Sequence, residues 1–209
     1  MTKRWIAVVA TGEASVEPDM AVVSLTVSAK GRELGPTRDD VNQRTSAVLA
    51  RLRELGVSDA DLQAPDVGIH PEYDYRKTGQ KLVGYLVTRA LTARVRELDT
   101  LGAVLDGVVA AGVNEVHGAQ MTASDPSAAE HDALRAAVEA AGAKAAAIAD
   151  AAGVQLGGIA RVEEEPDGGH VPMPRMRMTA MAEAGGVATE VAAGELTVTR
   201  RIRAWFDLG

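Results

Sequence analysis

The stretch MAVVSLTVSA at residues 20–29 alternates aliphatic side chains with serine and threonine. Successive side chains of a strand point to opposite faces of a sheet, so this period of two predicts a strand with one buried face. The β-branched segment at residues 6–11 predicts a shorter strand before it. Gly12 and the turn at Glu17-Pro18-Asp19 are expected to reverse the chain between these two strands.

The predicted helices span residues 36–55, 98–111 and 127–152, where apolar residues recur at spacings of three and four. Each is followed by a glycine, a residue that commonly ends a helix. The last of them carries an alanine at every fourth position from Ala137 to Ala149. Small side chains on one face imply close approach to a sheet or to another helix.

The segments at residues 67–75 and 82–95 are predicted to form a long hairpin that turns at Lys77-Thr78-Gly79-Gln80. The remaining strands are predicted at residues 116–123, 158–164 and 195–206. The order ββαββαβαββ favours an α+β fold of mostly antiparallel sheets, with helices packed on one face and two-layer α/β lobes.

We expect residues 1–209 to form a single unit. The alternative is a division of this unit into two discontinuous lobes. One lobe would combine residues 1–80 with 126–165, and the other would combine residues 81–125 with 190–209. The glycines, prolines and methionines of residues 166–193 follow no sustained period, which predicts a mobile loop.

Composition excludes several classes of function. Only 3% of residues are aromatic, so stacking platforms for bases or sugars are scarce. A net charge of -7 disfavours nucleic acid and anionic lipid as partners. The absence of cysteine removes thiol catalysis, thiolate metal sites and disulfides.

The N-terminal residues Lys3 and Arg4 precede an apolar stretch, as in a secretory leader. That stretch is interrupted at Thr11, whereas the apolar part of a leader needs about 7–15 uninterrupted residues. No segment approaches the roughly 20 apolar residues of a transmembrane helix. A cytoplasmic location is therefore the default expectation, and a periplasmic or extracytoplasmic one applies if a leader has been removed.

No motif in the sequence assembles a catalytic or metal site. The histidines, His70, His117, His131 and His170, do not occur as His-x-His, His-x-x-x-His or His-Glu-x-x-His pairs. The carboxylate clusters at Asp39-Asp40 and at Asp59 with Asp61 are expected to cap helix or turn starts, and Glu163-Glu164-Glu165 is expected to be solvated. We predict no cofactor, no metal and no enzymatic activity. A catalytic alternative would require His70 or His117 to meet a carboxylate in a cleft.

Two groups of residues are candidates for binding. Met173, Met176, Met178 and Met181 lie in the predicted loop, where they favour a mobile segment, a contact with a partner, or copper or redox chemistry. Tyr73 and Tyr85, on opposite strands of the predicted hairpin, would line a small-molecule pocket between the lobes.

The order and spacing of several short motifs resemble the SIMPL domain family, which includes bacterial periplasmic immunogenic proteins. These motifs are Thr11-Gly12-Glu13-Ala14, Pro18-Asp19-Met20-Ala21, Gly56-Val57, His70-Pro71-Glu72-Tyr73, Gly84-Tyr85, Ala133-Leu134 and Ala151-Ala152-Gly153-Val154-Gln155-Leu156-Gly157. The resemblance runs from about Ile6 to Phe206, apart from the methionine-bearing loop.

The resemblance implies a two-lobed α/β protein that self-associates, in some members into ring- or channel-like assemblies, and that is linked loosely to stress tolerance. It supplies no catalytic residues. Long strands with open edges recruit other chains, which also favours self-association. Our leading hypothesis is a non-enzymatic structural or interaction protein that forms a homo-oligomer. The alternative is a small-molecule binding module.

Overall fold

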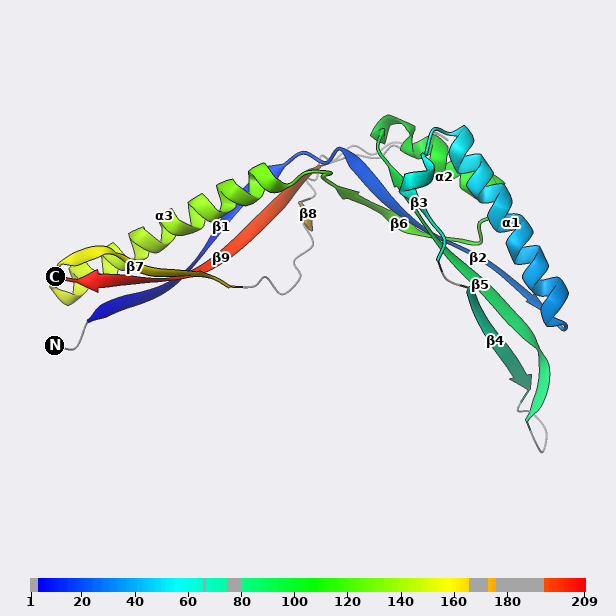
Figure 1. Cartoon of the computed structure of the whole chain (residues 1–209), viewed down its shortest axis with the longest axis horizontal. Coiled ribbons are helices and arrows are strands. Elements are labelled where there is room, and N and C mark those ends of the chain that lie inside the picture. Colours follow the sequence, from blue (N-terminus) through cyan, green and yellow to red (C-terminus); the bar gives the residue numbers. More distant parts are fainter. Residues whose placement is uncertain (1–3, 66, 75–79, 166–172, 176–193) are drawn as a thin grey trace, which may run out of the picture. The chain divides into compact units, whose positions relative to one another are not determined.

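The computed structural model describes residues 4–65, 67–74, 80–165, 173–175 and 194–209. It has the predicted α+β fold, built as two compact units with one antiparallel sheet each (Figure 1). The first unit contains β1 (Trp5–Val16), α3 (Ser127–Ala152), β7 (Leu156–Glu164), β8 (Met173–Arg175) and β9 (Glu195–Leu208). The second unit contains β2 (Met20–Gly31), α1 (Leu34–Glu54), β3 (Leu62–Gln63), β4 (Val67–Asp74), β5 (Lys81–Val95), α2 (Leu101–Ala110) and β6 (Glu115–Thr122).

The sheet of the first unit has the order β1-β9-β7, with β8 also paired to β9. Helix α3 lies on one face of this sheet and contacts mainly β1 and β9. It buries an alanine at every fourth position from Ala129 to Ala149, as the alanine spacing predicted. Opposite these alanines, the sheet contributes Ile6, Val8, Ala10, Ile202, Ala204 and Phe206 to the core.

Gly12 is a packing residue within β1, and the prediction that it helps to reverse the chain is wrong. It pairs with Arg200 in an unbroken register. A Cβ at this position would overlap the carbonyl oxygen of Ala133 and would lie 2.8 Å from the carbonyl carbon of Ala136. The backbones of β1 and α3 therefore touch here, which only glycine allows.

The sheet of the second unit has the order β3-β5-β2-β6, and β4 pairs with β5. Helix α1 packs against β2 and β5, and α2 packs against α1. The alternating residues Val23, Leu25 and Val27 are fully buried, as the opening pattern predicted. Short 3-10 helices at Asp59–Asp61 and Leu98–Thr100 precede β3 and α2.

Strands β1 and β2 do not form the hairpin that Glu17-Pro18-Asp19 was expected to close. β1 pairs with β9, whereas β2 pairs with β5 and β6. The units therefore divide the chain between Pro18 and Asp19 and between Thr122 and Ala123. This division differs from the expected lobes, because strand partners come from distant parts of the chain.

The observed order adds two short strands, β3 and β8, to the predicted one. β8 falls inside residues 166–193, where a loop was predicted, and pairs with β9 from Met173↔Thr197 to Arg175↔Glu195. The rest of the predicted loop, residues 166–172 and 176–193, lies outside the described residues.

Replacing Gly12 tests the contact between β1 and α3. We expect Gly12→Ala to lower the free energy of unfolding by about 3 kcal/mol, because the added methyl group must push two backbones apart. The matched control is Gly142→Ala on α3, where a Cβ would meet nothing within 4 Å. Alanine there should be neutral or should stabilise by up to about 1 kcal/mol. Urea denaturation measures both, and equal effects would contradict the proposed contact.

Candidate interaction surface

A two-stranded arm extends past the end of β2 in the second unit. Strand β2 pairs with β5 from Val95 to Tyr85, opposite Gly31, and ends there. The next residues of β5, Lys81–Gly84, have only β4 beside them among the described strands. We call β4 together with Lys81–Gly84 the arm; Val67–Pro71 lie opposite the part of β5 that β2 pairs with, and the tip of the arm runs past the end of β2 (Figure 1).

The arm exposes large apolar side chains. Val67, Ile69, Tyr73, Leu82 and Val83 each leave between 39% and 46% of their surface in solvent. Of these five, only Tyr73, Leu82 and Val83 lie past the end of β2, where the described sheet has two strands, and isolated two-stranded ribbons are only marginally stable in water. A concentration of such side chains on one ribbon is typical of a contact surface.

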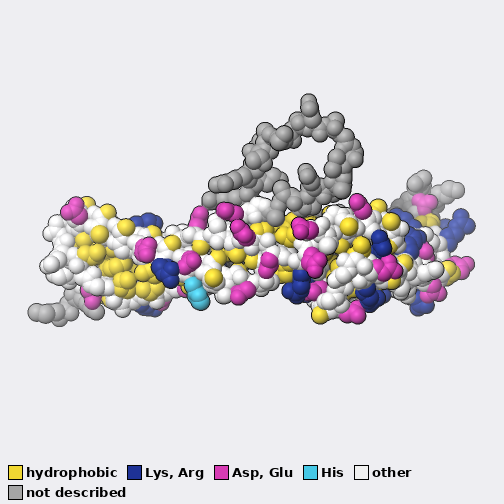
Figure 2. All heavy atoms as spheres, turned by 90° about the horizontal axis from the view of Figure 1, so that it is seen from above, with side chains coloured by type: hydrophobic (Ala, Val, Ile, Leu, Met, Phe, Trp, Pro, Cys, Tyr) yellow, Lys and Arg dark blue, Asp and Glu magenta, His cyan; other side chains and the backbone are white. Residues whose placement is uncertain are grey.

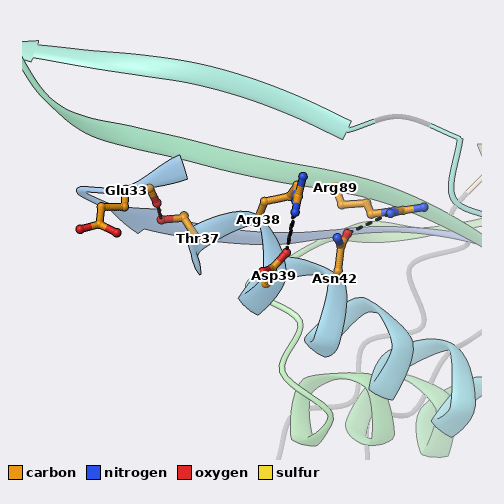
Figure 3. Close-up of polar contacts among 6 residues, drawn as sticks. All are labelled: Glu33, Thr37, Arg38, Asp39, Asn42 and Arg89. Carbon is orange, nitrogen blue, oxygen red and sulfur yellow. Dashed lines mark hydrogen bonds and ion pairs between the residues drawn. The ribbon is translucent and has the colours of Figure 1, made fainter. Parts of the chain in front are cut away.

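Close backbone packing fixes the base of the arm. A Cβ on Gly84 would lie 2.6 Å from the carbonyl oxygen of Gly31, so the two strands approach here with no room for a side chain. A Cβ on Gly31 would in turn overlap the buried hydroxyl of Thr37. That hydroxyl donates to the carbonyl oxygen of Glu33 at 2.6 Å in the first turn of α1 (Figure 3).

Arg89 of β5 ties the start of the arm to α1. Its Nη1 donates to Oδ1 of Asn42 at 3.3 Å, and Asn42 points toward it from the helix (Figure 3). Its Nη2 donates to the carbonyl oxygen of Ala64 at 3.1 Å, just before β4. Lys30 of β2 forms an ion pair with Glu72 of β4. These contacts position the arm relative to the sheet.

The two predicted pocket tyrosines are not direct partners across the hairpin. Tyr73 lies opposite Leu82, and Tyr85 lies opposite Pro71. A β-bulge after Glu72 shifts the register between these pairs. Both tyrosines belong to the second unit. A small-molecule pocket lined by them stays a prediction.

The described histidines do not converge on a metal site. His117 lies at a bulge of β6 next to Gly118, whose φ of 120° places it in a region that favours glycine. Its Nε2 is 2.8 Å from the hydroxyl of Thr26 and 3.9 Å from a carboxylate oxygen of Glu115. Within the described residues, no group of three or more histidine, aspartate or glutamate side chains is placed to hold a metal ion.

The acidic clusters are paired with arginines. On α1, Asp39 pairs with Arg38 and Asp40 with Arg44; Asp59 pairs with Arg53 of the same helix. The run predicted to be solvated follows the same rule: Glu163 pairs with Arg161, Glu164 with Arg200, and Glu165 with Arg201 and Arg203. No local pattern predicts the pairs of Glu164 and Glu165, because their arginines lie on β9, far along the chain.

Asp61 is also paired with an arginine, but it is buried, unlike the acidic clusters above. Its carboxylate accepts two hydrogen bonds of 2.8 Å from Arg96 and one of 3.0 Å from the hydroxyl of Ser58. The Arg96 guanidinium holds the pKa of this carboxyl below its usual value; burial opposes this shift and Ser58 adds to it. The ion pair fastens the segment after α1 to the end of β5, which is a structural role.

Of the predicted interaction loop, only Met173 lies in the described part of the chain, as the first residue of β8. Met176, Met178 and Met181 lie outside the described residues. Contact, copper and redox interpretations of these methionines therefore stay predictions.

The model of one protein family, "SIMPL: Protein of unknown function (DUF541)", matches residues 6–206. The chain belongs to the SIMPL family. It is 34% identical to the 26 kDa periplasmic immunogenic protein of Brucella melitensis, over 97% of this chain and 84% of that protein. It is 32% identical to the uncharacterized protein YggE of Edwardsiella ictaluri, over 84% of this chain and 74% of that protein.

The SIMPL motifs recognised in the sequence include glycines whose place in the structure is explained by packing. Gly12 and Gly84 each allow another backbone to approach, and Gly153 ends α3 in the left-handed conformation with a φ of 65°. The motif His70-Pro71-Glu72-Tyr73 lies on the arm. The family motifs therefore include both glycines that close packing requires and residues of the exposed strand β4.

The names of the SIMPL relatives bear on location. The Brucella proteins are named as periplasmic, so the cytoplasmic location expected by default finds no support here. Among the described helices, none combines the length and the apolar character that crossing a membrane requires.

The Asp61–Arg96 pair makes stability depend on pH. Because the pKa of folded Asp61 lies below the unfolded value of about 3.9, its stabilisation is complete above that value. It is lost as the pH falls through the lower pKa of the folded protein. We expect Asp61→Asn to lower the free energy of unfolding by about 2 kcal/mol at neutral pH, and by progressively less below about pH 4.

Chemical denaturation between pH 7 and pH 2.5 measures this difference. The control is Asp132→Asn, which removes an exposed pair with Arg135 and should cost less than about 0.5 kcal/mol throughout. A loss for Asp61→Asn that stays constant down to the lowest pH would contradict the lowered pKa.

Proposed function

We propose that this SIMPL protein is a non-enzymatic structural or interaction protein that forms a homo-oligomer through its arm. The observation that carries this proposal is the set of large apolar side chains on β4 and on residues 82 and 83 of β5 that leave 39% to 46% of their surface in solvent. Burying apolar surface stabilises by about 25 cal/mol per Å². In a symmetric dimer both subunits bury the same patch, so the apolar area removed from water is twice that of one arm.

The edge position of β4 supports the same proposal. Val67 and Ile69 are two residues apart, so both side chains lie on the same face of this edge strand. Pro71 further along β4 is typical of an edge strand, because proline cannot donate a backbone hydrogen bond. A partner that covers Val67 and Ile69 would bury the apolar surface that each of them leaves in solvent.

A non-enzymatic role is supported by how the acidic side chains are used. The carboxylates that the sequence offered for acid-base chemistry, on α1, on β7 and at Asp61, are held by arginines. At Asp61 the pairing with Arg96 lowers the pKa of the carboxyl, whereas a general acid needs a raised pKa.

The relatives named as periplasmic favour a periplasmic location for this chain as well, and the family resemblance favours a role in stress tolerance. If self-association serves that role, a deletion strain should be more sensitive to oxidant than the parent strain. The wild-type gene should restore growth and an arm variant that does not self-associate should not. Equal rescue by both genes would show that stress tolerance does not depend on self-association through the arm.

Substituting the exposed face of β4 tests self-association. We expect the wild-type protein to have a mass above that of a monomer at micromolar concentration. The double variant Val67→Thr/Ile69→Thr should shift toward monomer, because threonine keeps the β-branched shape and removes apolar surface. Size-exclusion chromatography with light scattering measures the mass.

The matched control is Val109→Thr on α2, which alters an apolar side chain that is 58% exposed in the same unit but away from the arm. It should leave the mass unchanged. A wild-type monomer at all salt concentrations would refute the proposal, and so would an arm variant with the wild-type mass and a normal melting temperature.

A further inference from the structure

The end of β2 leaves a hollow beside the arm. It has a volume of about 440 Å³ and is lined by Arg32, Lys81, Leu82, Val83 and Gly84. We call these residues the slot. Arg32 follows the last residue of β2, and the others are the stretch of β5 that β2 does not reach. The slot therefore continues the line of β2 along the same edge of β5.

The backbone of the slot is an open strand edge. Residues of β5 before Tyr85 pair with β4 on one side and have no described strand on the other. Every second residue of a strand directs its N–H and C=O groups to the same side. Gly84 is packed against the backbone of Gly31, so an added strand would pair along residues 81–83, which is how sheet edges capture extended peptides.

The side chains of the slot are basic and aliphatic. Arg32 and Lys81 are exposed, and neither forms an ion pair within the part of the chain that the structure describes. Lys81 is opposite Asp74 in the register of the arm. Leu82 and Val83 are 42% and 46% exposed. Lys and Arg side chains gather, among some acidic ones, toward the end of the second unit that carries the arm (Figure 2).

This combination of basic and aliphatic side chains determines which kind of ligand the slot can bind. Two cations at an open strand edge complement carboxylates, and the aliphatic side chains complement apolar residues between them. The whole chain carries a net charge of -7, so a long polyanion is repelled, whereas a short segment meets mainly the local cations. We propose that the slot binds a short, extended, acidic peptide segment, which adds as a strand beside Lys81–Gly84. This binding does not depend on self-association through Val67 and Ile69.

A blocked hexapeptide of alternating glutamate and valine, labelled with a fluorophore, tests the proposal on the full-length protein. We expect its fluorescence anisotropy to rise on binding, and added salt to weaken the complex. The double variant Arg32→Ser/Lys81→Ser should bind at least about tenfold more weakly, since each lost charged hydrogen bond reduces affinity. The control Arg38→Ser/Arg135→Ser makes the same change in net charge elsewhere and should bind as the wild type does.

A second peptide tests whether the occupant adds as a strand. The same hexapeptide with N-methylated valines keeps its charges and loses backbone donors, so it should bind much more weakly. Hydrogen exchange of the amides in Lys81–Gly84 should slow when the unmodified peptide is bound. These two measurements use the wild-type protein, so they hold even if a variant fails to fold.

Several outcomes would overturn the proposal. Equal binding of the N-methylated peptide, or displacement of the peptide by an equal concentration of inorganic phosphate, would show a simple anion site. No binding of the unmodified peptide, combined with a changed oligomeric mass of Arg32→Ser/Lys81→Ser, would assign the slot to a second copy of the chain. Wild-type binding by that double variant would also refute it.

Discussion

The close approach of Gly31 and Gly84 at the end of β2 is the constraint on which the exposed surface of this protein depends. β2 ends at Gly31, where the Thr37 hydroxyl fills the space that a side chain would take and α1 begins three residues later. β5 does not stop there, because β4 continues to pair with it. The sheet thus narrows to two strands, and side chains that a wider sheet with a helix layer would bury remain in solvent. The slot and the tip of the arm follow from this early end of β2, whereas Val67 and Ile69 lie opposite residues of β5 that β2 still pairs with.

Pairing between arginine and acidic side chains is the second feature that organises the structure. Acidic side chains on α1, β7 and the segment before β3 are held by arginines, some of them from distant strands. Most of these pairs are exposed and stabilise little individually. Arg32 and Lys81 stand apart because the described residues supply no acidic partner to either.

Local patterns predicted most of the elements. The helices at α1, α2 and α3 were found from apolar spacing and glycine stops, and the β4–β5 hairpin was found from alternation around a turn. The wrong predictions concern the role of one glycine and the pairing of the strands. Gly12 was interpreted as a turn residue, although a glycine that admits a neighbouring backbone looks the same in sequence. The bulges at Glu72 and Gly118 left no local signal.

The sequence by itself determined the α+β class, the family and the buried faces of β2 and α3, because these depend on patterns that can be read along the chain. Only the tertiary structure decided that β1 joins β9 and not β2, that the glutamates of β7 meet arginines of β9, and that β5 outruns β2. These features depend on contacts between residues far apart in the chain. Strand pairing of this kind is set by how whole sheets pack, and short segments carry no record of it.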